Sequence, residues 1–301
     1  MQNIIKFKYV FFVISLLVIL PGIYSMARYG LKLSIDFTGG TIMEVESMAL
    51  KDSGEREKIK KIVSKDVEVA SVSPIGETTV LFRTKAIENA QKEKLLTDLK
   101  GAYGPKINIS RFETVGPVIG QELTSKAIQA VVVASLAIII YIAYAFREIP
   151  PPYSPWKFGI SAVVALVHDV LVVVGVFSIL GHLYKVEIDA LFVTALLTVI
   201  GFSVHDTIVV FDRIRENLRK TAGKMPFAEV VNESILQTLA RSLTTSLTVL
   251  FTLLALVLFG GESIRWFTVA LLVGIFSGTY SSVFNAAPLL LVWEEYKRKK
   301  K

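Results

Sequence analysis

The stretch Leu196–Arg219, LLTVIGFSVHDTIVVFDRIRENLR, begins as an apolar run of membrane-spanning character and ends as a basic, water-facing segment. One carboxylate, Asp206, lies inside the apolar part, and His205 precedes it directly. An Asp at the centre of a bilayer costs roughly 2.5–3.5 kcal/mol on insertion scales, so its usual explanation is functional. We therefore interpret the rest of the chain as the surroundings and partners of Asp206.

The composition is that of an integral membrane protein. Of the 301 residues, 52% are hydrophobic, and the mean hydropathy is +0.56, which soluble proteins of this size rarely reach. We assign the net charge of +7 to Lys and Arg residues that flank apolar runs, and not to a nucleic-acid site. The absence of cysteine excludes disulfides, iron–sulfur clusters and thiolate zinc sites. The sequence has no GxxxxGK[ST] loop, which argues against ATP as the direct energy source.

Apolar runs of spanning length divide the chain into membrane helices. Each is long enough to cross roughly 30 Å of hydrocarbon at about 1.5 Å per residue. The six runs cover approximately 9–26, 128–146, 158–180, 188–211, 243–259 and 267–293. The first has a basic start and Pro21 near its end, so a cleaved signal peptide is the alternative to a membrane anchor. We expect the anchor, because six spans then place both termini on one side.

The distribution of basic residues predicts the orientation of the spans. The N-terminus, the 147–157 and 212–241 loops and the tail from Lys297 together carry 15 Lys and Arg residues. The opposite short loops carry only Lys185 and Arg265. The positive-inside rule counts short loops, so the long 30–117 segment is left out. Both termini are therefore expected in the cytoplasm, with the 30–117 segment facing outward.

The 30–117 segment reads as a separate α+β domain, between a first transmembrane helix at 1–29 and a five-helix region at 118–301. It carries 14 Lys and Arg residues and no run of spanning length. Alternating apolar residues predict strands, and Lys/Glu-rich stretches predict helices, the first capped by Ser53 and the second stopped by Gly101. The expected elements are strand 41–46, helix 53–66, strands 67–72 and 78–83, helix 86–100 and strand 106–114. This β-α-β-β-α-β order predicts a ferredoxin-like fold, and without a nucleophile–base set we expect no enzyme site in it.

Two His-Asp pairs lie inside consecutive antiparallel spans. They are His168-Asp169 and His205-Asp206, and His182 is the remaining histidine. We place Asp169 near mid-bilayer and Asp206 roughly 8 Å from the cytoplasmic end, an offset that suits a stepwise proton relay. Zinc binding by these side chains is an alternative, but adjacent helical residues point about 100° apart and rarely share one ion. The other alternative is that the Asp side chains only join helices and the His side chains only pack.

Arg241, at the cytoplasmic start of the fifth span, is the candidate partner of Asp206. An arginine stays charged and would hold the carboxylate ionised, whereas breaking the pair would favour protonation by desolvation. Thr245, Thr248 and Thr252 repeat with Arg241 at helical spacing, which predicts one polar face. The alternative for Arg241 is an ordinary basic anchor at the membrane surface.

Small residues in the fourth and sixth spans accompany these polar groups. Gly274-x-x-x-Gly278 permits close helix approach, and Gly201 and Ser203 stand beside the Asp of the fourth span. Packing alone explains such faces. Together with Asp206 and its candidate partner they also outline a hydrated path at the centre of the bundle.

Four stretches carry a resemblance to a known family. They are Asp36-Phe37-Thr38-Gly39-Gly40-Thr41 after the first span, Val115–Gly120 before the second, Gly201–Thr207 continuing into Asp212-Arg213 and on to Asn217, and Arg241–Thr248. The chain resembles, over essentially its whole length, the SecF membrane subunits of the bacterial Sec translocation machinery, which belong with SecD to the resistance–nodulation–division (RND) superfamily. Two departures are visible: Phe202 replaces the usual Tyr and His205 the usual Asn. An imidazole beside Asp206 would change the pH at which a relay works.

The resemblance implies a fold, partners and a mechanism. It implies an RND-type bundle of six transmembrane helices in the bacterial inner membrane, paired with a separate SecD chain, because the SecD half is absent here. SecY-E-G, YajC and exported preproteins are further implied partners, with no nucleic acid and no cofactor other than protons. The proton-motive force would promote late translocation through Asp206 and Arg241, with Asp169 and His205 in support. An RND exporter of small molecules, which needs a large aromatic outer cleft, and a non-transporting scaffold are the rival functions.

Overall fold

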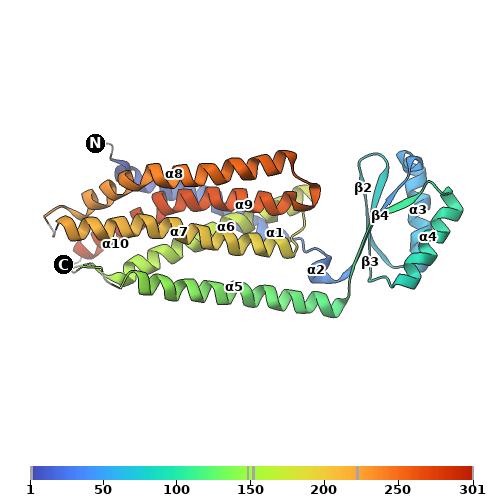
Figure 1. The fold of residues 1–301 in the computed structure, drawn as a ribbon, viewed down its shortest axis with the longest axis horizontal. Helices are drawn as coiled ribbons and strands as arrows, with labels where there is room; N and C mark the ends of the chain where they lie inside the picture. Colours follow the sequence, from blue (N-terminus) through green and yellow to red (C-terminus); the bar gives the residue numbers. More distant parts are fainter. Residues whose placement is uncertain (1–2, 148, 151–152, 222–223, 300–301) are drawn as a thin grey trace. The chain divides into compact units, whose positions relative to one another are not determined.

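The computed structural model describes residues 3–147, 149–150, 153–221 and 224–299. It divides into two compact units. We call residues 1–32 with 129–301 the helical unit, and residues 33–128 the α+β unit. Figure 1 shows the helices of the first and the small sheet of the second.

Six helical stretches have the length and apolar character of membrane spans, which confirms the predicted fold class. They are α1 (Lys8–Tyr29), preceded by the turn Ile4–Phe7, α5 (Pro117–Ala145), α6 (Pro155–Tyr184), α7 (Ala190–Thr221), α8 (Phe227–Phe259), and α9 (Glu262–Ser281), which continues through the π-helical segment Ser282–Ala286 into α10 (Ala287–Lys299). The predicted 212–241 loop is wrong, since most of it is helix. The apolar run predicted for the fifth span begins only at 243, but α8 begins sixteen residues earlier. The buried side chains of Phe227, Val230 and Ile235 extend its packed face over that earlier part.

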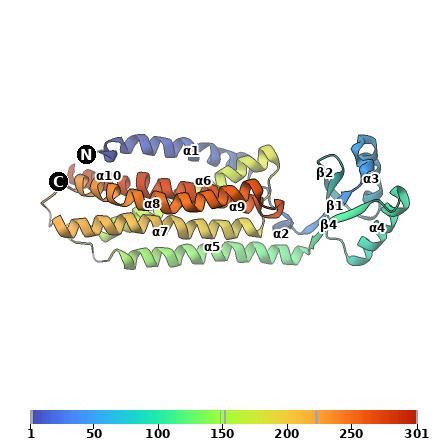
Figure 2. The same ribbon diagram turned by 45° about the horizontal axis from the view of Figure 1, so that its top comes forward.

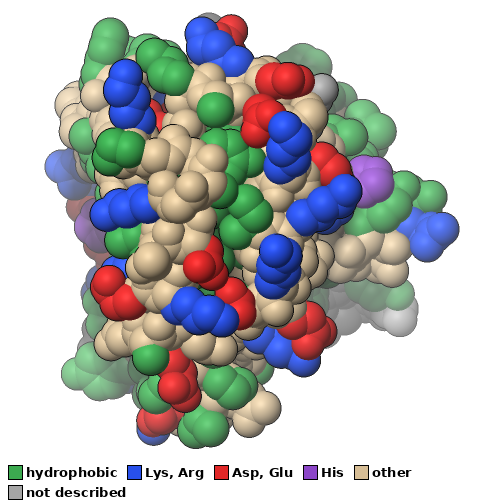
Figure 3. Space-filling view, turned by 90° about the vertical axis from the view of Figure 1, so that its right-hand side faces the viewer, with side chains coloured by type: hydrophobic (Ala, Val, Ile, Leu, Met, Phe, Trp, Pro, Cys, Tyr) green, Lys and Arg blue, Asp and Glu red, His purple; other side chains and the backbone are tan. Residues whose placement is uncertain are grey.

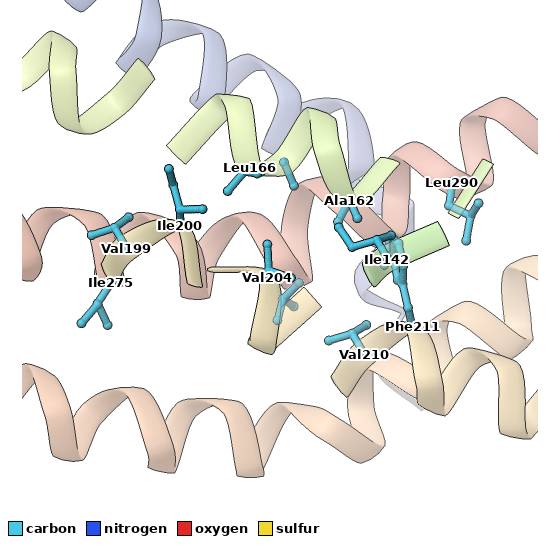
Figure 4. Packing of buried hydrophobic residues seen from close by; sticks show 14 of the residues in the cluster. Ile142, Ala162, Leu166, Val199, Ile200, Val204, Val210, Phe211, Ile275 and Leu290 are labelled. Carbon is cyan, nitrogen blue, oxygen red and sulfur yellow. The ribbon is translucent and has the colours of Figure 1, made fainter. Parts of the chain in front are cut away.

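Helix α7 packs against α6, α8 and α9 in the helical unit. The core around it is mostly aliphatic, and Figure 4 shows Val199, Ile200 and Val204 of α7 among side chains of the neighbouring helices. Near the end of the unit where α1 begins, the rings of Phe146, Phe158 and Phe211 meet with centroids 5.3–5.9 Å apart. This order of helices puts the central stretch of α7 deep in the bundle.

Helix α1 is part of the bundle and crosses α6 closely. A Cβ on Gly22 would lie 2.8 Å from the Cα of Gly175, so only glycine fits at this crossing. The hydroxyls of Ser25 and Ser178 are 2.9 Å apart and buried. These contacts make α1 part of the packed helical unit.

Two ion pairs hold the end of the helical unit at which α1 begins and α10 ends, here called the terminal end. Lys157 Nζ of α6 lies 2.7 Å from Glu294 of α10, and both side chains are mostly buried. Lys8 of α1 pairs with the adjacent Glu295 at 2.6 Å. Buried charges need such partners, so these pairs fix α10 against α6 and α1. Figure 2 shows the two chain ends at this end of the unit.

The α+β unit has the predicted element order and a four-stranded antiparallel sheet. The strands are β1 (Gly40–Glu46), β2 (Val69–Ile75), β3 (Thr79–Thr84) and β4 (Asn108–Val115), in the spatial order β2-β3-β1-β4. The main helices are α3 (Ser53–Asp66) and α4 (Asn89–Tyr103), and the short elements are α2 (Ile35–Thr38) and the 3₁₀ turn Met48–Lys51. Side chains of β1, β3, α3 and α4 form its buried core, which includes Met43, Phe82 and Leu95.

Three helix boundaries of this unit differ from the sequence prediction. Asp52, not Ser53, is the N-cap of α3, because its carboxylate accepts a hydrogen bond from the Gly54 amide at 2.9 Å. Helix α4 begins at Asn89 instead of residue 86, continues through Gly101 and ends at Tyr103, and the C-cap Gly104 has a φ of +78°, which suits glycine at a helix end. The face seen in Figure 3 carries interspersed basic and acidic side chains, as expected for a solvated surface.

The Asp36–Gly40 and Val115–Gly120 motifs pack together inside the α+β unit. A Cβ on Gly39 would lie 2.9 Å from Pro117 Cα, and one on Gly120 would lie 2.8 Å from the Gly39 amide. Thr124 Oγ1 also donates to the Phe37 carbonyl at 3.4 Å. The compact unit therefore covers 33–128, whereas the sequence analysis placed the domain at 30–117, because the first turns of α5 pack on this glycine-rich corner.

Gly40 offers a test of this corner. Its φ is +121°, and a Cβ would lie 2.7 Å from the Thr84 carbonyl oxygen. We expect Gly40→Ala to destabilise the α+β unit by about 1–3 kcal/mol, the usual cost of a strained backbone position. Hydrogen exchange of the full chain in detergent, followed by mass spectrometry, should show faster exchange in β1 and β3. Gly76→Ala is the matched control, since Gly76 also has positive φ but no atom within 4 Å of the added Cβ. Equal effects would contradict the steric explanation.

A second test concerns the crossing of α7 and α9. A Cβ on Gly274 would overlap Val199 Cγ2 and lie 2.6 Å from Val199 Cγ1, whereas one on Gly201 meets nothing within 4 Å. Both glycines are in helix interiors, so the alanine substitutions share the same gain in helix propensity. We expect overpacking in Gly274→Ala to destabilise the bundle by about 1–3 kcal/mol and so to lower its melting temperature in detergent. Gly201→Ala should leave the melting temperature unchanged or raise it. Adding Val199→Ala should rescue Gly274→Ala; without rescue, the crossing is not the cause.

Candidate functional site

Asp206 is buried in the middle of α7 and holds few hydrogen bonds. Its side chain is 2% exposed. Ser246 of α8 donates to Asp206 Oδ2 at 3.4 Å, close to the outer limit of a hydrogen bond. Thr279 of α9 donates in turn to Ser246 Oγ at 2.6 Å. This short chain of hydroxyls links α7, α8 and α9 through a carboxylate that is weakly satisfied.

Asp169 of α6, in contrast, is fully caged by hydrogen-bond donors. Ser203 of α7 and Ser281 of α9 both donate to Oδ2 at 2.6 Å, and Ser277 donates to Oδ1 at 2.7 Å. The Nδ1 atom of His168 lies 3.0 Å from Oδ1. Hydroxyl bonds of 2.5–2.7 Å to a carboxylate are the short, charge-assisted kind. The cage therefore supplies hydrogen bonds to both carboxylate oxygens of Asp169 although this residue is completely buried.

The two carboxylates differ in what the protein offers to their charge. Within the described part of the chain, three hydroxyls donate to Asp169 at 2.6–2.7 Å and an imidazole lies beside it, whereas the Ser246 hydroxyl donates to Asp206 at 3.4 Å. A buried charge without partners is unfavourable, and gaining a proton removes the charge. The geometry therefore ties Asp169 to α7 and α9 and leaves Asp206 more weakly held.

Gly278 makes the Asp169 cage possible. A Cβ at this position would lie 3.1 Å from Ser203 Cβ and 3.6 Å from Asp169 Oδ2. The absence of a side chain thus lets α9 approach α7 closely enough for Ser277 and Ser281 to reach the carboxylate. Gly274, one turn away on α9, likewise lets α9 approach α7 closely, at Val199.

The expected pairing of Asp206 with Arg241 is absent from the structure. No ion pair joins the two among the residues that the structure describes, and Arg241 is exposed on α8. Thr245 and Thr248, on the same side of α8, are exposed as well, and so are Gly201 and His205 of α7. The polar face predicted from periodicity exists, but it faces out of this bundle, so these residues do not line a path inside it.

The sequence analysis missed the polar face of α8 that does point inward. The buried residues Ser234, Thr238, Ser242 and Ser246 recur every four positions and lead along α8 to Asp206. Ser242 Oγ is buried and has no hydrogen-bond partner within the described part of the chain. The signal was present as serine and threonine at i, i+4 spacing, one residue away from the Arg241 stripe.

The Asp212–Asn217 motif forms the continuation of α7 at the terminal end. Arg215 pairs with Asp212 at 2.5 Å, and Arg213 pairs with Glu216 at 2.6 Å. Asn217 is buried and donates to Ser234 Oγ and Gln237 Oε1 at 2.8 and 3.0 Å. The motif therefore fixes α7 to the start of α8, where the polar inner face of α8 begins.

The metal-site alternative has no matching arrangement in the described residues. They contain no group of three or more His, Asp or Glu side chains placed to hold an ion. His168 adjoins Asp169, but His205 is exposed, and His182 stacks on Tyr29 with ring centroids 3.6 Å apart. The polar atoms of the bundle are arranged around single carboxylates.

Comparison with known proteins matches nearly the whole chain. The family model "Protein export membrane protein SecD/SecF, C-terminal" covers residues 94–296, and the model "SecD/SecF GG Motif" covers residues 24–47. The protein translocase subunit SecF of Thermobaculum terrenum is 46% identical, over 98% of this chain and 94% of the relative. That of Anaerolinea thermophila is 45% identical with the same coverage.

Longer relatives contain a region similar to this chain as one part. The protein translocase subunit SecDF of Bacillus subtilis is 37% identical, over 98% of this chain and 38% of the relative. The crystal structure of SecDF from Thermus thermophilus, described as a translocon-associated membrane protein, matches with a TM-score of 0.80 and 33% identity. The match covers 98% of this chain and 39% of that structure. By its family models and by relatives of full length, this chain belongs to the SecD/SecF family, as one of its SecF-type protein translocase subunits.

Proposed function

We propose that this translocase subunit uses the proton-motive force to promote protein export, with Asp206 as the group that is protonated. The observation that carries the proposal is the difference in hydrogen bonding between the two buried carboxylates. Asp169 receives short hydrogen bonds from three hydroxyls, whereas Asp206 receives one at 3.4 Å. Of the two, Asp206 is the one whose charge the surrounding helices hold weakly.

Protonation of Asp206 would be coupled to the conformation of the bundle. A neutral Asp206 tolerates a dry, apolar surrounding, whereas an ionised one favours a conformation that supplies partners or water. A proton that binds the two conformations unequally shifts their populations. The membrane potential contributes about 2.3 kcal/mol per charge per 100 mV, enough to bias such an equilibrium.

Arg241 is the proposed partner in the other conformation. It precedes Ser246 by five residues on α8, roughly 7.5 Å along the helix axis, which a long arginine side chain can cover. A rotation or shift of α8 would exchange the Ser246 contact for an ion pair with Arg241. His205, exposed beside Asp206 on α7, is the second group that would respond to the proton.

The inner face of α8 is the proposed entry for water and protons on one side. The buried hydroxyls of Ser234, Thr238 and Ser242 lead from the terminal end of the bundle to Ser246 and Asp206. Ser242 Oγ has no partner in the described residues and is available to water. In the orientation given by the positive-inside rule, this is the cytoplasmic side of a bacterial inner membrane, where both termini lie.

The exposed polar face on α7 and α8 is the proposed contact with a SecD chain. Gly201, His205, Arg241, Thr245 and Thr248 are exposed at membrane depth, where polar groups favour contact with protein over lipid. SecDF relatives carry a sequence like this one inside a chain that is more than twice as long. We extend the proposal to SecY-E-G, YajC and exported preproteins as partners, with a transport role and no enzymatic one.

Replacing the protonated group tests the proposal. Asp206→Asn removes the charge but keeps the size, and we expect export of a secreted reporter to fall about tenfold and to lose its response to an uncoupler. Such a loss corresponds to roughly 1.4 kcal/mol of lost coupling. The measurement is translocation of the reporter into inverted membrane vesicles that hold the variant and its partners.

The controls separate proton coupling from a scaffold role. Arg241→Lys keeps the charge and should retain more export than Arg241→Gln. Asp169→Asn should lower the melting temperature of the purified chain, because it disrupts a hydroxyl cage, whereas Asp206→Asn should not. Normal, uncoupler-sensitive export by Asp206→Asn would contradict the proposal and favour the scaffold.

A further inference from the structure

A second feature of the helical unit lies between α5 and α6 near the terminal end. It is an apolar cavity of about 510 Å³, open along one side, which we call the α5–α6 groove. Its α5 side comprises Ile139, Ile142, Ala143 and, just beyond the helix, Arg147, and its α6 side comprises Pro155, Trp156, Gly159, Ile160, Val163 and Val164. Neither buried carboxylate lines the groove.

The groove exists because α5 packs loosely on the bundle. Only 6% of the most apolar 18-residue window of α5 is buried, against 50% for α6. Ile142 and Phe146 attach α5 to the core. On the α6 side, Gly159 leaves a notch, since an added Cβ would meet only Ile142 Cγ2, at 3.8 Å. The apolar walls therefore remain uncovered by the chain itself.

The dimensions of the groove match one lipid chain. From Pro155 to Val164 the wall rises roughly 14 Å, about half of the 30 Å hydrocarbon core and thus one leaflet. An acyl chain that extends from the membrane surface to the bilayer centre covers this length.

The mouth of the groove has the chemistry of a membrane surface that binds anionic lipid. The Arg147 guanidinium lies 3.7 Å from the centre of the Tyr144 ring and donates to the Tyr144 carbonyl at 3.3 Å. Trp156, 76% exposed, stands at the same level on α6. Tyr and Trp mark the interface, and a basic residue there attracts acidic headgroups. The adjacent Lys157 is engaged with Glu294 on the inner side.

We propose that the α5–α6 groove binds an anionic glycerophospholipid, whose phosphate contacts Arg147 and whose acyl chain lies along Gly159 and the aliphatic residues beyond it. The lipid fills the space that the loose packing of α5 leaves against α6. This inference does not rest on the proton-coupled function, since it involves neither carboxylate.

Trp156 provides the reporter for a test. The full chain with Trp266→Phe and Trp293→Phe retains Trp156 as its single tryptophan. It is reconstituted in phosphatidylcholine vesicles that contain a minor fraction of either phosphatidylglycerol or phosphatidylcholine with brominated acyl chains, which quench tryptophan fluorescence. We expect about fivefold tighter apparent binding for the brominated phosphatidylglycerol, the size expected for one basic residue at a membrane surface.

Three variants assign the preference to the groove. Arg147→Gln should abolish it, and Arg147→Lys should retain most of it. Gly159→Leu should fill the notch and weaken quenching by both lipids, with the melting temperature as a check on folding. Lys6→Gln removes an exposed basic residue elsewhere at the terminal end and should change nothing. Equal quenching by the two lipids, absence of quenching, or a preference that survives Arg147→Gln would each overturn the proposal.

Discussion

A carboxylate inside a bilayer must either receive hydrogen bonds from the protein or give up its charge, and this constraint organises the helical unit. Asp169 receives them: hydroxyls from α7 and α9 and the imidazole of its neighbour surround it completely. Asp206 receives weaker support from the described residues, because Ser246 donates to it at 3.4 Å. Asp169 therefore joins helices through short hydrogen bonds, and Asp206 is held less tightly.

The close approach of α7 and α9 is what separates the two roles. Gly274 and Gly278 remove the side chains that would hold the helices apart, and the gap closes until Ser277 and Ser281 reach Asp169. The same register places Thr279 on the other side of α9, where it orients Ser246 toward Asp206. The small residues let the helix backbones approach closely, and this close approach brings the serine hydroxyls within hydrogen-bond distance of the buried carboxylate.

Sequence patterns predicted the architecture well because length and periodicity determine it. Six apolar runs became six helical stretches, and the β-α-β-β-α-β order became the expected sheet. Position along a helix was predictable too, which placed Asp206 inside a span. What periodicity does not show is which face points at which neighbour. Arg241 and Thr245 form a real stripe, but it faces outward, whereas the stripe one residue away, through Ser242 and Ser246, faces the core. The serines around Asp169 could not be predicted from periodicity, because they come from α7 and α9 and meet the Asp169 of α6 only in the packed bundle.

The central proposal is that Asp206 is the buried carboxylate of the bundle that changes its protonation state. Infrared difference spectroscopy of the purified chain in lipid, recorded as the pH is lowered, measures this directly through the carbonyl stretch of a newly protonated carboxylic acid. The account predicts a band from a buried acid that disappears in Asp206→Asn and persists in Asp169→Asn. A band that persists in Asp206→Asn and disappears in Asp169→Asn would contradict it.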